Sequence, residues 1–545
     1  MTNTSRLLPE NLTLDRQQRI AQIRDQGKWD LIIIGGGITG AGILKLASQI
    51  GIKVLLLEQK DFAWGSSSRS SKMVHGGLRY MAQGDVKLTL ESVKERQRLI
   101  TEGSQLITEQ SFVMSHYKYQ FPWPWLFNLL LDFYDFFSGL KRHKFWKKSD
   151  YLSLVPQIKE ESLLGGTQFT DALTDDARLV QRLIQEAKYL DGQALNYARV
   201  TSFIQKSNRI TGVNVQLEGE VGNNFELEAK VVVNATGAWS DLLKTENKEP
   251  AFKMRPLRGS HLVIPSWRLP VASAVSILHP EDKRPVQIYP WQNVTLVGTT
   301  DVEHGENINS EARISRQEFD YLMECIKHQF PKANIAEKDI ISTFSGIRPV
   351  IAGGGFIAPS QEKRDHSIFQ SPGLITVTGG KLTTFRLIAE QVMTEVAKHL
   401  GLSLKGFRQA IFEPYEEKQT LNICHKTKQL QACYGILAKA FVQQSAKELF
   451  QPIGYSRHLW AELVWAVKYE QVVHLDDLML RRTRLGNVLP NGAKEYLSHI
   501  RKLCQPFLNW GKTKWQQEIS RYLKIWQSSY SLPSKKALSQ TEGND

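Results

Sequence analysis

Three glycines and an acidic residue near the start of the chain have the types and spacing of a dinucleotide-binding turn. Gly35, Gly37 and Gly40 follow one apolar run, and Glu58 ends a second apolar run. In such a turn the glycines permit the tight bend, the approach of backbone to a pyrophosphate, and close packing of the next helix. A carboxylate about 20 residues later accepts hydrogen bonds from an adenosine ribose. The alternative is an ordinary strand-to-helix turn.

The segments around these residues are the ones that this chemistry requires. The apolar runs at residues 31–34 and 54–57 predict two buried strands, and residues 38–49 predict the helix between them. The amides and the positive dipole end of that helix then face the phosphates. Residues 29–58 therefore predict a βαβ unit that binds a dinucleotide.

Length and charge restrict what surrounds this unit. The chain has 545 residues, 41% of them hydrophobic, which predicts two or three domains. A formal net charge of +14 suggests an anionic partner such as a membrane surface, a phosphorylated substrate or nucleic acid, or simply a solvated basic surface. The four scattered cysteines favour neither a disulfide framework nor a metal site and fit a reducing compartment. Residues 1–28 lack the apolar core of a signal peptide, so we expect a partly ordered extension.

The most apolar stretch of the chain is residues 121–140, FPWPWLFNLLLDFYDFFSGL. Two prolines and two aspartates interrupt it, so it does not predict a transmembrane helix. The basic run KRHKFWKK follows at residues 141–148. Aromatic residues beside clustered cations suit a membrane interface, and a buried helix with a solvated basic end explains the composition equally well.

The rest of the chain predicts a mixed architecture. Short apolar segments at residues 200–203, 210–217 and 225–233 predict antiparallel strands. The last of them continues into Ala235, Thr236 and Gly237, which we place beside the dinucleotide. Residues 374–378 predict a strand that is followed by a glycine-rich turn and a helix at 382–400. We predict an extension (1–28), a cofactor domain (29–405) with an inserted substrate part (about 110–175 and 255–350), and a helical domain (406–545).

Eight motifs occur in succession along most of the chain up to residue 386. They are GGGITGAG (35–42), SSSRSSKMVHGGLRY (66–80), TDDARLV (174–180), NATGAW (234–239), RGSHLV (258–263), GTTD (298–301), SGIRP (345–349) and GGKLTTFR (379–386). Together they resemble the FAD-dependent glycerol-3-phosphate dehydrogenases and occur in the order of that family. The segment HLDDLMLRRTRLG at 474–486 is similar to the family's C-terminal helical domain.

This resemblance implies an α/β fold and a specific reaction. The fold is an FAD-binding Rossmann-like domain of the two-dinucleotide-binding-domain type, with an inserted antiparallel β-sheet substrate domain and a C-terminal helical domain. The reaction is oxidation of sn-glycerol 3-phosphate to dihydroxyacetone phosphate, with hydride transfer from carbon 2 to FAD and onward transfer of electrons to membrane quinone. We further expect a cytoplasmic protein that is peripherally associated with the inner face of the cell membrane, with a homodimer as one candidate state, and without a metal or a nucleic-acid partner.

By the same resemblance, individual residues acquire candidate roles in substrate binding and catalysis. Arg348, Arg79 and Arg364 are candidates for the phosphate, because guanidinium groups bind phosphate bidentately. His75 is the candidate general base, or else it only positions flavin or substrate. Lys381 is the candidate to hold either the reactive edge of the flavin ring or the substrate oxygen, and a cation there also stabilises the reduced, anionic flavin. Tyr80 is a secondary polar contact of the substrate.

The residues expected to contact FAD come from five parts of the chain. The serine-rich loop is expected to supply hydroxyl and amide groups to the phosphate and the ring. Asp176 and Asp301 are expected to orient arginines or cap helices. The predicted FAD contacts are Gly35, Gly37, Gly40, Glu58, Ser70, Ser71, Gly76, Ala235, Thr236, Gly237, Gly380, Lys381, Leu382 and Thr383.

Three other functions are compatible with parts of the sequence. A soluble glycerol-3-phosphate oxidase of the same fold would pass electrons to dioxygen, and the aromatic, basic segment at 121–148 favours quinone instead. An FAD-dependent amine oxidase would use an arginine for a substrate carboxylate, whereas three candidate arginines favour phosphate. Net charge alone favours a non-enzymatic protein that uses the fold to bind nucleic acid or another partner, and the sequence contains no aromatic-basic RNA module.

Overall fold

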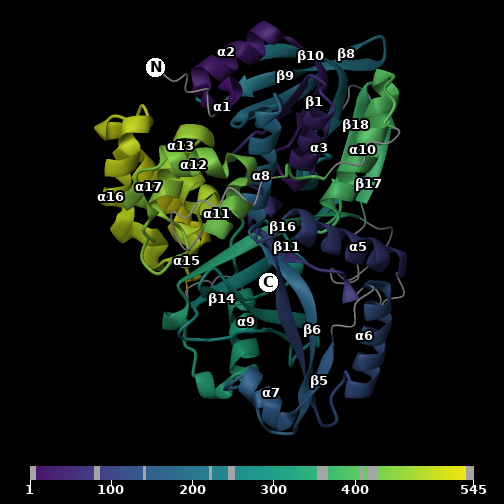
Figure 1. The fold of residues 1–545 in the computed structure, drawn as a ribbon, viewed down its shortest axis with the longest axis vertical. Helices are drawn as coiled ribbons and strands as arrows, with labels where there is room; N and C mark the ends of the chain where they lie inside the picture. Colours follow the sequence, from purple (N-terminus) through teal and green to yellow (C-terminus); the bar gives the residue numbers. More distant parts are fainter. Residues whose placement is uncertain are drawn as a thin grey trace, which may run out of the picture.

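Two β-sheets and a helical domain make up the protein. The computed structural model describes residues 8–78, 86–138, 143–219, 224–243, 252–352, 366–404, 410–414 and 427–534. In Figure 1 the first sheet, sheet A, lies at the top, the second, sheet B, lies below it, and the C-terminal helices lie along one side of both. This arrangement confirms the predicted fold class.

Sheet A contains the predicted dinucleotide-binding unit. Its strands run in the order β17-β18-β10-β1-β2-β7, and β8 and β9 extend it from β10. The pairs among β18, β10, β1, β2 and β7 are parallel. The strands are β1 (Lys28–Ile34), β2 (Val54–Leu57), β7 (Gln193–Leu195), β8 (Ala198–Lys206), β9 (Arg209–Leu217), β10 (Asn224–Asn234), β17 (His366–Ser371) and β18 (Leu374–Gly379).

Both faces of sheet A are covered, which is why its central strands are apolar throughout. Leu31 and Ile33 of β1 pack against α3 (Ile38–Gln49), α8 (Asp176–Tyr189) and α10 (Phe385–Leu400). Ile32 and Ile34 face the opposite core, which contains residues of β8, β9 and β10. The antiparallel pairing of β8, β9 and the first half of β10 confirms the prediction for residues 200–233.

The N-terminal segment is more ordered than its polar composition suggested. From residue 8 onward it contains α1 (Glu10–Thr13) and α2 (Arg16–Gln26). Asp15 and Gln18 form a reciprocal capping box at the start of α2. Arg19 is buried and donates a hydrogen bond to Asn11 Oδ1 at 2.7 Å. Internal polar contacts, which composition does not reveal, fix these helices against sheet A.

Sheet B forms the lower half of the molecule. Its strands run in the order β15-β11-β14-β13-β12-β4-β6-β3, with β16 on β11 and β5 on β6. Within the described residues β12 and β4 are parallel, and the other pairs are antiparallel. The strands are β3 (Met73–Val74), β4 (Ile107–Tyr117), β5 (Lys144–Lys147), β6 (Leu163–Thr174), β11 (Met254–Pro265), β12 (Ala274–Leu278), β13 (Pro285–Trp291), β14 (Val294–Gly298), β15 (Val302–Glu303) and β16 (Ser342–Ile351).

Residues 121–140, for which the sequence left open a membrane-interface segment or a buried helix, contain helix α6 (Pro124–Ser138). Its inner side is buried through Phe127, Leu131 and Tyr134. Its outer side exposes Trp125 by 64% and Phe136 by 80%. A wholly buried helix is therefore wrong for this segment, because a full apolar side faces solvent. Among the described residues every helix is too short or too polar to cross a membrane.

Further helices cover sheet B and the space between the two sheets. In Figure 1, α5 and α6 lie at one edge of the lower half, and α7 and α9 lie near its lower end. The helices are α5 (Val86–Glu102), α7 (Lys148–Leu154) and α9 (Arg316–Gln329), with short 3-10 turns η1 (Ser66–Ser68), η2 (Gly237–Trp239), η3 (Pro331–Ala333) and η4 (Glu337–Asp339).

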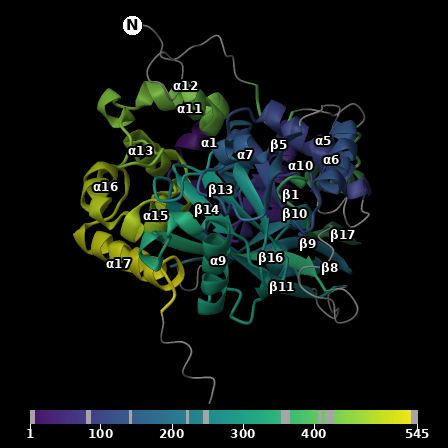
Figure 2. The same cartoon turned by 90° about the horizontal axis from the view of Figure 1, so that it is seen from below.

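The C-terminal domain is helical, as predicted, and ionic contacts join it to sheet A. Figure 2 shows its helices on one side of the molecule. Asp61 is fully buried and accepts hydrogen bonds from Arg481 and Arg482. Burial favours a raised pKa for Asp61, but the two guanidinium groups lower this pKa to about 2. The helices are α11 (Thr427–Tyr434), α12 (Ala438–Gln444), α13 (Trp460–Tyr469), α14 (Leu475–Asp477), α15 (Leu485–Val488), α16 (Leu497–Cys504) and α17 (Lys512–Ser529), with shorter turns η6 (Gly435–Leu437), η7 (Lys447–Phe450), η8 (Leu478–Arg482), η9 (Pro490–Tyr496) and η10 (Gln505–Phe507).

Candidate active site

A cleft of about 280 Å³ lies at the carboxyl end of β1, beside the glycine turn. Gly35 and Gly37 line it, and α3 begins at Ile38, so the first amides of this helix lie at the cleft. Gly35 has φ +111°, and a Cβ there would lie 2.6 Å from Ala235 O. The bend therefore requires glycine at this position for both conformation and space.

Gly40 and Gly76 lie outside the linings of the cavities at the site. A Cβ on Gly40 would lie 1.9 Å from Gly35 O, so this glycine permits close packing of α3 on the turn. A Cβ on Gly76 would lie 1.9 Å from Tyr134 Oη, and its amide donates to Asp171 Oδ1 at 3.0 Å. These two glycines therefore contribute to a cofactor site by allowing the backbone to pack closely, and not by lining the cavities.

Glu58 has the position that the sequence predicts for a ribose-binding carboxylate. It lines the cleft directly after β2. Its Oε2 accepts a hydrogen bond from the Gly36 amide at 2.6 Å, and its Oε1 accepts one from the Lys60 amide at 2.8 Å. Burial raises the pKa of Glu58. Each oxygen has a second lone pair, so the carboxylate is fixed in place and can still accept from a ligand hydroxyl.

The opposite walls of the cleft come from the residues that follow β10 and from the turn after β18. Ala235, Thr236 and Gly237 line it on one side, and Gly380, Lys381 and Leu382 line it on another. The predicted helix at 382–400 begins only at Phe385, because residues 380–384 form the turn that contributes to this wall. Glycine backbone, a helix N-terminus and a carboxylate at one cleft suit the phosphates and ribose of FAD.

The hydroxyl groups of the serine loop are largely used inside the protein. Ser66 donates to Ile347 O, and Ser67 Oγ accepts from the Ile38 amide at 3.0 Å. The Ser70 amide and hydroxyl both donate to Asp176 Oδ2, at 3.0 and 2.7 Å. Ser71 Oγ lies 3.0 Å from His261 Nε2. The loop is therefore fixed by long-range contacts, and its shape is its main contribution to the site.

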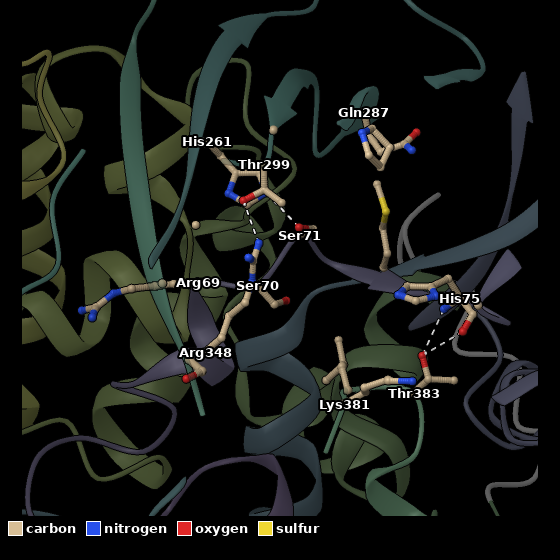
Figure 3. Close-up of a pocket in the computed structure, with 18 of the residues that line it drawn as sticks. Arg69, Ser70, Ser71, His75, His261, Gln287, Thr299, Arg348, Lys381 and Thr383 are labelled. Carbon is tan, nitrogen blue, oxygen red and sulfur yellow. Dashed lines mark hydrogen bonds between the residues drawn. The ribbon is translucent and has the colours of Figure 1, made fainter. Parts of the chain in front are cut away.

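A second cavity, of about 380 Å³, joins the cleft and extends onto sheet B. Ser66, Ser70, Pro349, Gly380, Lys381 and Leu382 line both. Figure 3 shows residues of the second cavity, with Arg348, Thr299 and His261 at one side and His75, Thr383 and Lys381 at another. A ring lying at this junction would be accessible to a small molecule in the second cavity.

Arg348 lies in the wall of the second cavity, on β16. It forms an ion pair with Asp301, and its Nη2 donates to Thr299 Oγ1 and Thr300 O, each at 3.2 Å. These contacts confirm the expectation that Asp301 orients an arginine. Because three neighbours fix the guanidinium group, it can present its charge to an anion with little loss of side-chain freedom.

His75 and Thr383 are joined by reciprocal contacts. The His75 amide donates to Thr383 Oγ1 at 3.1 Å, and Thr383 Oγ1 donates to His75 O at 3.2 Å. Both residues line the second cavity, as does Lys381. The structure therefore brings together three of the predicted residues from segments about 300 positions apart in the sequence. Arg79, Tyr80 and Arg364 lie outside the described residues.

His261 is a candidate that the sequence predictions missed. It lines the second cavity, is fully buried, and stacks on Phe344 with ring centroids 4.6 Å apart. Burial lowers the pKa of His261 well below its usual value, and Lys72 and Arg348 lower it further. The imidazole is therefore neutral at physiological pH, and the same surroundings make it a weaker proton acceptor than an ordinary histidine. The sequence shows that His261 belongs to the motif RGSHLV. It does not show that the side chain faces the cavity, because that depends on the register between strands.

Arg69, Thr299 and Gln287 also line the second cavity without having been predicted. Arg69 pairs with Glu311 outside the cavity, and Thr299 contacts Arg348. Among the described residues, no group of three or more histidine, cysteine or acidic side chains could bind a metal ion.

Comparison with known proteins identifies relatives along nearly the whole chain. A family model described as FAD dependent oxidoreductase matches residues 30–392, and one described as C-terminal domain of alpha-glycerophosphate oxidase matches residues 407–515. The aerobic glycerol-3-phosphate dehydrogenase of Staphylococcus haemolyticus is 32% identical over 94% of this chain and 96% of its own length.

Two solved structures with a similar fold contain bound FAD. The glycerol-3-phosphate dehydrogenase from Bacillus halodurans complexed with FAD has a TM-score of 0.73 and 25% identity, covering 94% of this chain and 97% of that one. L-alpha-glycerophosphate oxidase from Mycoplasma pneumoniae has a TM-score of 0.53 and 18% identity, covering 69% of this chain and 95% of that one. At that identity the second similarity concerns the fold alone.

Proposed function

This chain belongs to the FAD-dependent glycerol-3-phosphate dehydrogenases, and we propose that it passes the electrons of sn-glycerol 3-phosphate to a membrane quinone. The enzyme is an oxidoreductase with FAD as its cofactor. Bound FAD supplies the hydride acceptor for carbon 2 of the substrate. The observation that carries the substrate assignment is a fixed arginine in the wall of a cavity that joins the dinucleotide cleft.

In this proposal Arg348 binds the substrate phosphate. Its contacts with Asp301, Thr299 and Thr300 fix the orientation of the guanidinium plane. A planar, permanently charged group suits the oxygens of a phosphate dianion, because two N–H groups can donate side by side. Arg79 and Arg364 belong to the same proposal as additional phosphate ligands.

When carbon 2 loses its hydride, the hydroxyl group on that carbon must also lose its proton. We assign its acceptance to an imidazole nitrogen of His75, and His261 is the second candidate. Lys381 lies at the junction of the two cavities, where its ammonium group would stabilise negative charge on a reduced flavin. Thr383 fixes the backbone of His75 and so maintains its distance from this junction.

Anaerobic mixing of the purified yellow protein with glycerol 3-phosphate tests the substrate assignment. We expect the visible absorbance of the flavin to bleach within seconds, and to persist with glycine or proline at the same concentration. Bleaching by the amino acids, or persistence with glycerol 3-phosphate, would contradict the proposal.

The family match of residues 407–515 to an oxidase domain favours dioxygen as a second candidate acceptor. Stoichiometric hydrogen peroxide in aerated turnover would identify the enzyme as an oxidase.

The outer side of α6 supports a membrane acceptor. Trp123, Trp125, Leu129, Phe133 and Phe136 are 47–80% exposed along this segment. Exposed lysines on β5 and at the start of α7 lie close by, because His143, next to Lys144, contacts Asp135 of α6 at 2.7 Å. Exposed aromatic side chains beside cations suit the boundary between anionic headgroups and acyl chains.

Aromatic contacts lead from this helix to the wall of the second cavity. Phe127 of α6 packs against Phe169 with ring centroids 6.0 Å apart, and Phe169 stacks on Phe112 at 5.6 Å. Phe169 and Phe112 line the cavity. The apolar wall of the cavity thus packs against the inner side of the helix whose outer side is the proposed membrane face, so the two lie on opposite sides of α6.

Binding to vesicles tests the membrane face. We expect the protein to bind vesicles containing phosphatidylglycerol at low salt and to leave them at high salt, because the cations are screened. The triple variant Trp125→Gln, Phe133→Gln, Phe136→Gln should bind at least about 10-fold more weakly. The control Trp267→Gln changes a tryptophan that is 59% exposed elsewhere on the surface. Equal binding of the triple variant and the control would refute this face.

A further inference from the structure

The serine loop that lines both cavities is fixed from the C-terminal domain. Arg484, located between η8 and α15, is only 2% exposed. Its Nη1 donates to Ser68 O at 3.1 Å and to Leu480 O at 2.8 Å. Its Nε and Nη2 donate to the Asp175 carboxylate, at 3.1 and 2.9 Å, and its Nη2 also contacts Asp176. One side chain therefore joins the helical domain, the loop and the start of α8.

Asp176 extends this connection to the cavity. Its Oδ2 accepts from the Ser70 amide, the Ser70 hydroxyl and Lys72 Nζ, the last at 2.9 Å. Lys72 Nζ also donates to Ser68 O at 2.7 Å. Asp176 is fully buried, whereas Ser70 lines both the cleft and the second cavity. The orientation of Ser70 thus depends on a carboxylate whose other oxygen contacts Arg484.

The charges in this cluster balance only when Arg484 is present. Asp175 and Asp176 carry two negative charges, and Lys72 and Arg484 carry two positive charges. Without Arg484, the buried Asp176 carboxylate and the partly exposed Asp175 carboxylate next to it would share one ammonium group. Such an arrangement is strongly unfavourable in a buried site, so the loop would move to admit water or separate the carboxylates.

A second side chain of the C-terminal domain contacts the same loop. Tyr530 Oη accepts from Arg69 Nε at 3.1 Å and lies 3.3 Å from Glu311 Oε2. In Figure 3 the Arg69 side chain points away from the other labelled residues. The Tyr530 carbonyl accepts from the Thr343 amide at 2.7 Å, which fixes the end of α17 on sheet B. Two independent contacts thus attach the loop to this domain.

We propose that Arg484 is a positioning residue of the active site, through which the C-terminal domain sets the position of Ser70 at the junction of cofactor and substrate. The inference rests on the proposed function, since the junction is where FAD and glycerol 3-phosphate would meet. It gives the C-terminal domain a part in the reaction although no residue of that domain lines either cavity within the described residues.

The test compares two buried arginines that pair across the same domain boundary. Arg484→Lys retains the positive charge but cannot donate to Ser68, Asp175 and Asp176 together. The matched control is Arg178→Lys, because Arg178 lies on α8, is 4% exposed, and donates two hydrogen bonds to Glu470 without contacting the loop. Both variants remove a buried bidentate pair, so both should lower thermal stability by similar amounts.

Only the Arg484 variant should change the active site. We expect Arg484→Lys to weaken FAD binding at least about 10-fold and to slow anaerobic reduction of its bound flavin by about 100-fold at saturating substrate, as displacements of about 1 Å do. Arg178→Lys should leave both quantities within about twofold of the wild type. Unchanged FAD affinity and reduction rate in Arg484→Lys, or equal losses in the two variants, would overturn the inference.

A second variant covers the case in which Arg484→Lys does not fold. Asp176→Asn retains the shape of the side chain but removes the charge that binds Lys72 and Arg484, so the same two losses are expected. Normal FAD affinity and reduction in Asp176→Asn would also overturn the inference. If glycerol 3-phosphate does not bleach the flavin of the wild-type protein, the proposed function is wrong. The inference about Arg484 can still be tested in that case, because FAD affinity is measured without substrate.

Discussion

Replacing Arg348 by alanine should raise the Michaelis constant for glycerol 3-phosphate about 100- to 1,000-fold while FAD stays bound. Truncating one partner of a desolvated charge pair costs about 2–5 kcal/mol, and about 1.4 kcal/mol corresponds to a factor of ten. The loss should lie toward the upper part of this range, because Asp301 would then face the phosphate without its cation. Steady-state kinetics and the visible spectrum measure the two effects separately.

Two further variants show whether the effect belongs to the site. Arg348→Lys retains charge but loses the planar fork, so it should recover only part of the affinity. Arg284→Ala is the control, since Arg284 Nη1 donates to Asp301 O at 3.0 Å but its side chain does not line the cavity. If Arg348→Ala loses its flavin, or if its Michaelis constant stays near the wild-type value, Arg348 does not bind the phosphate.

The cofactor half of the site could be predicted because its signals are local. The turn at Gly35 and Gly37 depends on backbone conformation, which the residue type restricts directly. The strands on either side are buried on both faces, so each reads as a continuous apolar run. Glu58 follows its strand at a fixed offset from the glycines. All of these signals lie within about 30 consecutive residues of the sequence.

The substrate half depends on pairing between distant strands. His261, Gly298 and Gln287 are direct neighbours across β11, β14 and β13, and all three line the second cavity. This register decides which side chains share a face of the sheet. Residue type alone gave no reason to prefer His261 over the other twelve histidines of the chain. The partners of the serine loop are equally remote, since Ser70 contacts Asp176 and Ser66 contacts Ile347.

Buried charge was the other feature that composition could not reveal. Arg481, Arg482 and Arg484 are each at most 2% exposed, although arginines are mostly surface residues. Their burial is possible because Asp61 and Asp175 supply opposite charges from the cofactor domain. A sequence pattern shows the arginines but not the carboxylates that face them. The ionic contact between the two domains therefore becomes visible only in three dimensions.

Gly35→Ala should abolish FAD binding while the protein remains folded. The added Cβ would lie 2.6 Å from Ala235 O and 2.9 Å from Ala235 C, both backbone atoms of the residue that follows β10 at the wall of the cleft. Relief of this contact requires β1 and β10 to separate at the point where the cofactor phosphates would lie. The left-handed backbone adds a strain of about 1 kcal/mol. The ratio of flavin to protein after purification measures the effect.

Gly51→Ala separates the two causes of that loss. Gly51 has φ +73° just after α3, and a Cβ there would have no heavy atom within 4 Å. It therefore imposes similar backbone strain without a collision, so we expect stoichiometric flavin and a slightly lower melting temperature. Loss of flavin in both variants would identify backbone strain as the cause. A stoichiometric amount of flavin in Gly35→Ala would show that FAD binding does not depend on this turn, because the added Cβ disturbs the backbone only there.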